Sequence, residues 1–264
     1  MLLPVSDLAF HQSLGSLVTR IDSDQFWPAL ATFLRKAGPF DSWVALIYQN
    51  GHPPIVLYEG DSDGTEDALF IKYVNSLYVL DPFYQFSLSQ FAPGLYRIDD
   101  VAPEHFRETE YFRRYFVHNV VADEVQFLIP LRDHGVLSLS LGGQTRFADS
   151  TIGTFCLFTP WLLPLMRLAT YADCNGALRT ARTETNRADL VNLEDWLRTN
   201  ASSPLTDREI QTTMLILKGH SAKAIAHKMG ISPETVKIHK RNLYRKMGVS
   251  SQAGIFAQFI NMEG

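Results

Sequence analysis

The last sixty or so residues of this 264-residue chain carry signals that start and end helices at short intervals. A segment with such closely spaced signals can fold only as a bundle of short helices. Thr206 followed three residues later by Glu209 is the pattern of a capping box. Gly219 is the kind of residue that ends a helix, and Ser221 can cap the next one. The sequence predicts four helices, over 206–218, 221–229, 232–248 and 250–260.

The second and third of these helices are joined by the short turn Gly230-Ile231-Ser232. Pro233 follows in the first helical turn, where a missing N–H is tolerated. Val236, Leu243 and Met247 form an apolar inner stripe along the third helix, while its Lys and Arg residues occupy the other faces. Two helices joined in this way, the second one basic, predict a helix-turn-helix whose second helix enters the DNA major groove.

Charge divides the chain in the same place. Residues 204–264 contain nine Lys or Arg against four Asp or Glu, a net charge of +5, whereas residues 1–203 contain 15 against 24, a net charge of −9. A basic segment can be an ordinary solvated helix face, but here it coincides with the helix-turn-helix pattern. The sequence therefore predicts double-stranded DNA as a partner of the C-terminal part.

Three segments carry a family resemblance: LTDRE at 205–209, GHSAKAIAHKMGIS at 219–232 and TVKIHKRNLYRKMGVSS at 235–251. In this order they resemble the LuxR-type helix-turn-helix of bacterial transcription regulators. The resemblance implies sequence-specific DNA binding by an all-α domain of four helices.

The resemblance also places the DNA contacts. Base contacts are expected from the exposed positions of the recognition helix, Lys237, Ile238 and Arg241. Lysine and arginine can donate to guanine O6 and N7, and an aliphatic side chain can touch a thymine methyl group. Phosphate contacts are expected from residues near helix N-termini and from further basic residues, namely Ser221, Lys223, Thr235, Lys240 and Arg245.

Residues 1–172 predict one α+β domain, an antiparallel sheet flanked by helices of the GAF or PAS kind, or similar to an autoinducer-binding domain. Residues 173–203 are polar and predict a helical linker before the DNA-binding domain at 204–264. The expected helices of the first domain are 7–21, 23–37, 66–80 and one from about 149, and the expected strands are 42–49, 55–58, 124–131 and 136–141.

Aromatic residues cluster between Tyr73 and Phe127. Aromatic rings with a few polar groups can enclose a small organic effector, and packing without a ligand is the alternative. Residues 73–82 are similar to the ligand-binding region of quorum-sensing LuxR proteins, but Ala68 and Lys72 depart from that pattern. The stretch resembles better the sensors of LuxR-type regulators that lack a partner synthase. The candidate effector contacts are Tyr78, Asp81, Tyr84, Tyr96, Tyr111 and Phe127.

Catalytic and metal-binding functions are not predicted. The sequence has no G-x-S-x-G elbow, H-E-x-x-H helix or phosphate-binding loop, and its scattered His and acidic residues form no catalytic set. Cys156 and Cys174 lack metal-ligand spacing and are expected to be buried or half-buried thiols. We therefore expect neither an enzyme nor a cofactor.

Location and assembly follow from two apolar segments. Residues 150–166 carry no charge, but Pro160 and Pro164 interrupt them, which favours a kinked core helix over a membrane span. With no basic leader at the N-terminus, a cytoplasmic protein is expected. The apolar helix at 250–260 could pair two copies as a homodimer.

Two functions stay open: a regulator controlled by an effector, and an effector-independent regulator whose first domain dimerises or recruits a partner.

Overall fold

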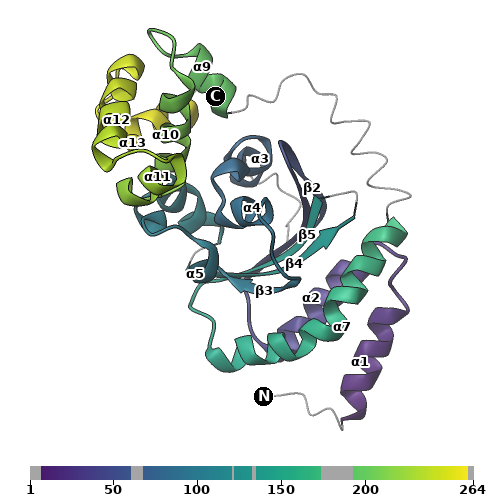
Figure 1. Ribbon diagram of the computed structural model, residues 1–264. Coiled ribbons are helices and arrows are strands. Elements are labelled where there is room, and N and C mark those ends of the chain that lie inside the picture. The colour runs from purple at the N-terminus through teal and green to yellow at the C-terminus, as the bar shows by residue number, and fades with distance from the viewer. Residues whose placement is uncertain (1–6, 61–67, 121, 133–134, 174–192, 261–264) are drawn as a thin grey trace. The chain divides into compact units, whose positions relative to one another are not determined.

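The computed structural model describes residues 7–60, 68–120, 122–132, 135–173 and 193–260 (Figure 1). They form two compact units. Unit 1 comprises Met1–Glu66, Phe86–Asp100 and Val120–Ala188, and unit 2 comprises Asp67–Gln85, Val101–Asn119 and Asp189–Gly264. Unit 2 therefore combines the C-terminal helices with two stretches from the first half of the chain.

Unit 1 is built on the expected antiparallel sheet, which has five strands in the order β2-β1-β5-β4-β3. Two hairpins supply four of the strands, and Gly51 and Gly135 sit at their turns with positive φ angles of 73° and 92°. The sequence did not predict β3, whose four residues are too few to show a period. The strands are β1 (Ser42–Gln49), β2 (His52–Glu59), β3 (Gly94–Arg97), β4 (Asp123–Leu131) and β5 (Gly135–Gly143).

One face of the sheet is covered by helices (Figure 1). These are α2 (Phe26–Ala37) and α7 (Asp149–Asp173), while α1 (Leu8–Val18) packs on them through Phe10, and the short α5 (Ile98–Val101) follows β3. Phe127 of β4 lies in this core with its ring centroid 6.0 Å from that of Phe155, and Phe33 of α2 lies 5.5 Å from Phe158. Each large apolar side chain buried here contributes about 1.5–3 kcal/mol to stability, which fixes the helices on this face.

Helix α7 contains both Pro160 and Pro164, as the expected kinked helix does. It is long and apolar enough to cross a membrane by length and composition alone, and 39% of an apolar 18-residue stretch within Asp149–Ala172 is buried. Cys156 is exposed on this helix, so the expectation of a buried thiol was wrong for it. In a helix with one apolar face, residues three or four positions apart share a face, and the residues between them face outward. Position 156 falls on the outward side. Cys174 lies outside the described residues.

The first part of unit 2 is a series of short helical segments. The single helix expected over 66–80 is divided at Ser76, and the 3₁₀ turn that follows leads into α4. The segment at 112–116 is a π-helix, in which the backbone is locally widened. The segments are α3 (Ala68–Asn75), η1 (Leu77–Leu80), α4 (Pro82–Ser87), η2 (Phe106–Glu108), η3 (Phe112–Phe116) and α6 (Val117–Asn119).

The C-terminal part of unit 2 contains the four expected helices. They are α10 (Asp207–Leu217), α11 (Ala222–Met229), α12 (Pro233–Met247) and α13 (Gln252–Ile260), preceded by α9 (Leu193–Thr199). Trp196 of α9 packs against Phe259 of α13 with 5.4 Å between ring centroids. Ile255, Phe256 and Phe259 are buried within the unit, so the apolar residues of α13 serve its own core. Of the expected linker helix, residues 174–192 lie outside the described part.

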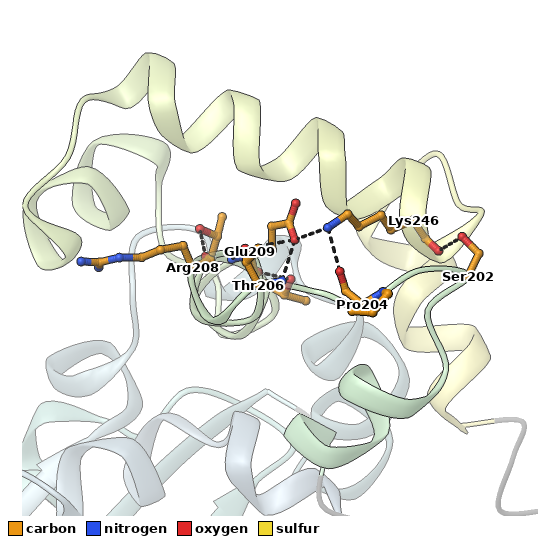
Figure 2. Close-up of polar contacts among 8 residues, drawn as sticks. Ser202, Pro204, Thr206, Arg208, Glu209 and Lys246 are labelled. Carbon is orange, nitrogen blue, oxygen red and sulfur yellow. Dashed lines mark hydrogen bonds and ion pairs between the residues drawn. The ribbon is translucent and has the colours of Figure 1, made fainter.

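A buried carboxylate joins the first and third helices of this bundle (Figure 2). Glu209 closes the expected capping box, because its Oε2 accepts from the backbone N–H of Thr206 at 2.8 Å. The same oxygen accepts from Nζ of Lys246 on α12, also at 2.8 Å, and Lys246 donates to the carbonyl of Pro204. Burial acts to raise the pKa of Glu209, but the hydrogen bonds from Lys246 and Thr206 outweigh it and hold the pKa below its ordinary value. The ionised pair therefore fixes α12 against the start of α10.

Replacing Lys246 should test this link. In Lys246→Met the carboxylate of Glu209 stays buried without its cation, so we expect a loss of about 3–5 kcal/mol in the free energy of unfolding at neutral pH. A group with a lowered folded-state pKa stabilises the fold above its ordinary pKa, and that stabilisation is lost as the pH falls through the lowered value. The difference between variant and wild type should therefore shrink on acidification.

Urea denaturation at neutral pH and near pH 4 would measure both effects. Lys228→Met, at an exposed lysine of α11, is the control and should be near neutral. Equal effects of the two substitutions would contradict the assignment.

Candidate DNA interface and effector site

Helices α11 and α12 and the turn between them have helix-turn-helix geometry. Ser221 caps α11 by accepting from the N–H of Ala224, and Ser232 caps α12 by accepting from the N–H of Thr235 at 3.1 Å. Gly230 ends α11 at φ 64°, a left-handed conformation that glycine adopts without steric cost. The local sequence thus sets the turn that orients α12.

The inward faces of these helices form one small core. Ile225 and Ala226 of α11 pack with Val236 of α12 and Ile216 of α10, and Leu243 and Met247 are also buried. These apolar positions leave the opposite side of α12 in solvent, as an amphipathic helix requires.

The outward face of α12 is basic. Lys237, Lys240, Arg241 and Arg245 are exposed, and Ile238 among them has 48% of its surface exposed. Because the Ile238 side chain is exposed, it does not contribute to the core of this unit. Positively charged groups attract phosphates, and an aliphatic group on the same face offers the contact that a thymine methyl group accepts. The structure therefore brings five of the eight expected DNA-contact residues onto one exposed surface.

The three remaining residues lie at helix N-termini. Ser221 and Thr235 are half-buried, and Lys223 is exposed in the first turn of α11. The unpaired N–H groups of a helix start and its dipole favour an anion there. This placement is what a phosphate contact requires.

The second face of the sheet in unit 1 carries a buried polar network that the sequence reasoning missed. Gln126 of β4 accepts from the hydroxyl of Ser138 on β5 at 2.7 Å and donates to Glu124 at 2.7 Å. Glu124 accepts from Ser140 at 2.6 Å, and Tyr48 of β1 lies 3.3 Å from Gln126. All five side chains are buried. The signal was the alternation of polar and apolar residues in DEVQFLIPL and VLSLSLG, which was used only to place strands.

Four of the expected effector contacts lie in unit 2. Asp81 accepts from the hydroxyl of Tyr73 at 2.6 Å and from the backbone N–H of Phe83 at 2.8 Å. Tyr78 and Tyr84 meet edge to face at 4.9 Å, and burial, with a smaller effect of Tyr84, raises the pKa of Tyr78 to about 12. All of these groups are buried, as is the fourth residue, Tyr111.

The other two expected contacts lie in unit 1. Phe127 is fully buried in the core beneath α7, on the sheet face opposite to its neighbour Gln126. Tyr96 of β3 is half-buried, and its hydroxyl donates to the carbonyl of Ala92 at 2.6 Å. A molecule in contact with the polar sheet face therefore does not reach Phe127.

Comparison with known proteins identifies the family to which the C-terminal helices are similar. Residues 203–257 match the family described as bacterial regulatory proteins, luxR family, and this span contains α10 to α12 and most of α13. Residues 203–257 are a LuxR-family DNA-binding domain. LuxR proteins are transcriptional regulators and not enzymes, so the sequence-based expectation of a DNA-binding regulator is confirmed at this level.

Two relatives extend the comparison beyond this domain. An HTH-type transcriptional regulator from the exeN 3′ region of Aeromonas salmonicida is 27% identical over 186 residues, which are 69% of this chain and 93% of that protein. The crystal structure of the VqsR LBD domain from Pseudomonas aeruginosa is 38% identical, with a TM-score of 0.58, over 63% of this chain and 99% of that one. A match of that length falls mostly outside residues 203–257. The chain is thus similar to known proteins both within and outside its LuxR-family domain.

Proposed function

We propose that this LuxR-family regulator binds a specific DNA sequence and that a small organic effector, bound by its N-terminal part, controls this binding. The observation that carries the DNA part is the exposed basic face of α12, with Ile238 between its cations. The regulator is proposed to act in the cytoplasm, where its DNA target is accessible.

The residues on α12 divide into two roles in this proposal. Lys237 and Arg241 are one helical turn apart and donate to guanine O6 and N7, and Ile238 contacts a thymine methyl group. The phosphate contacts come from Ser221, Lys223, Thr235, Lys240 and Arg245, and they set the position of the helix without reading sequence.

Substitutions on α12 should separate the two roles. Lys237→Ala and Arg241→Ala should lower the preference for the operator over random duplex, since each good base contact is worth about 1–3 kcal/mol of discrimination. Lys240→Gln should instead weaken binding to both duplexes and reduce the salt dependence by about one unit of slope.

Fluorescence anisotropy with both duplexes at several fixed salt concentrations would measure these effects. Lys36→Ala, which removes a positive charge from α2 of unit 1, is the control. Unchanged discrimination in both alanine variants would remove Lys237 and Arg241 from the base contacts.

We also propose that the regulator binds DNA as a homodimer. The apolar core residues of α13 are buried inside unit 2, so the proposal rests on the size of the DNA-binding surface. A single recognition helix reads one half-site, and two copies related by a twofold axis double the contacts.

Sedimentation of the protein–operator complex should therefore give two chains per operator at physiological salt. A point of comparison is a duplex with only one half-site, which should bind much more weakly. Saturation of the full operator by one chain would rule out the dimer.

Two observations support an effector. The relative at 38% identity is named an LBD domain, and the match covers most of the chain outside residues 203–257. The polar network of Glu124, Gln126, Ser138 and Ser140 lies on a strand surface that is otherwise apolar. A few placed polar groups in an apolar surrounding are what a small-molecule site uses to fix orientation. Tyr78, Asp81, Tyr84, Tyr96, Tyr111 and Phe127 stay predictions of effector contact.

A thermal-shift screen of the full chain against a panel of small organic molecules would test this. A true effector present at about 100 times its Kd stabilises the folded state by about 2.7 kcal/mol, a rise in Tm of several degrees. Ser138→Ala should reduce the rise, whereas Ser89→Ala, at an exposed serine, should not. If no molecule in a broad panel shifts the Tm, the effector-independent function, with dimerisation or partner recruitment by the N-terminal part, is favoured.

A further inference from the structure

Within unit 2, two stretches from the first half of the chain contact the turn between α10 and α11. The backbone N–H of His105 donates to the carbonyl of Gly219 at 2.9 Å. Lys218, the residue that ends α10, donates from Nζ to Oε1 of Gln85 at 2.8 Å. Phe106, next to His105, is buried. Residues 104–106 and Gln85 therefore hold the four-residue turn 218–221, which leads directly into α11.

Gly219 is what allows this approach. It has a φ of 90°, and a Cβ atom built on it would lie 2.8 Å from both Cα and N of Phe106. Cβ atoms do not approach other atoms so closely, so any larger residue would push the 104–106 segment away. Gly230 and Gly248 are also left-handed, but a Cβ at either of them would meet nothing within 4 Å. Of these three glycines, only Gly219 is thus in close backbone contact.

The contact places a negative charge at the start of α11. Glu104 precedes His105, and the pKa of its carboxyl is lowered by its own backbone N–H and then by the backbone N–H of Ser221. Ser221 is the N-cap of α11. The unpaired N–H groups at this helix start attract any anion, whether a carboxylate or a DNA phosphate.

The two anions would therefore use the same place. In a helix-turn-helix the first of the two helices, here α11, crosses the DNA backbone. Ser221 and Lys223 are the phosphate contacts proposed above for its N-terminus. With Glu104 beside Ser221, a phosphate arriving there would meet a carboxylate at short range.

We propose that residues 104–106 form an autoinhibitory contact: they hold the 218–221 turn and keep Glu104 at the N-terminus of α11, so that DNA binds tightly only after this segment is released. The inference rests on the proposed DNA-binding function, because it concerns the same phosphate contacts. It assigns to the 104–106 segment a role in DNA affinity although the segment itself touches no DNA.

Charge substitutions in the full chain provide the first test. Glu104→Gln should raise the affinity for a random-sequence duplex at low salt by at least about 5-fold, the lower end of ordinary coupling between sites. Gln85→Ala, which removes the acceptor of Lys218, should raise it as well. Glu108→Gln is the matched control, since it removes the same charge from an exposed residue four positions further on, whose carboxylate pairs with the ring of His105. Equal affinities in Glu104→Gln, Glu108→Gln and wild type would overturn the proposal.

Gly219→Ala provides a second test that does not alter charge. Both Gly219→Ala and the control Gly248→Ala introduce a side chain at a left-handed position, but only the first displaces Phe106. Gly219→Ala should therefore bind the duplex more tightly than Gly248→Ala does, provided that circular dichroism shows both to be folded. Weaker binding by a folded Gly219→Ala variant would count against the contact.

Amide hydrogen exchange measures directly whether the 104–106 segment is released from the 218–221 turn. The N–H of His105 should be protected in the free protein and should exchange faster when the random-sequence duplex is added. An amide that stays protected in the DNA complex would show that the contact and DNA coexist, and would overturn autoinhibition while leaving DNA binding intact. If neither wild type nor any variant binds duplex DNA, the proposed function itself fails, so the two failures are distinguishable.

Discussion

The carboxylate of Glu209 is the point on which the DNA-binding half depends. One of its oxygens holds the start of α10 through Thr206, and the same oxygen holds the end of α12 through Lys246. A charged group is buried at a cost that only close partners offset, and here one partner, Thr206, precedes the helix-turn-helix and the other, Lys246, lies near its end. The angle at which α12 presents Lys237 and Arg241 is therefore fixed from its far end, by a residue that itself faces away from solvent.

The N-terminal half depends on a different constraint, the alternation of side chains along a strand. On β4, Phe127 enters the apolar core beneath α7, and its neighbour Gln126 joins the polar network with Ser138. A single strand thus separates a packing surface from the polar surface proposed to meet the effector by one residue. The network is internally hydrogen-bonded, which holds its donors and acceptors in fixed positions, and such preorganisation lowers the cost of binding a polar ligand.

Much of the DNA-binding half was predictable from the sequence because its signals are local. The pairs Thr206 with Glu209 and Ser232 with Thr235 are three residues apart, so cap and helix can be read together. The exposed face of α12 also followed from helical spacing. The effector contacts were less predictable, because the sequence does not distinguish a tyrosine that packs in a core from one that binds a ligand. Tyr111 is an example. The short strand β3 and the break at Ser76 were missed because so few residues show no period.

The sequence by itself determined the family of the DNA-binding domain, the four C-terminal helices, the strands of the two hairpins and the basic surface, since each depends on residues close together in the chain. Tertiary structure alone decided which distant residues meet. Lys246 reaches Glu209 from 37 positions away, and Lys218 reaches Gln85 from 133. Pairing at such separations depends on how helices and strands pack in space, which local periodicity does not encode. The polar face of the sheet and the contact between His105 and Gly219 exist only at that level.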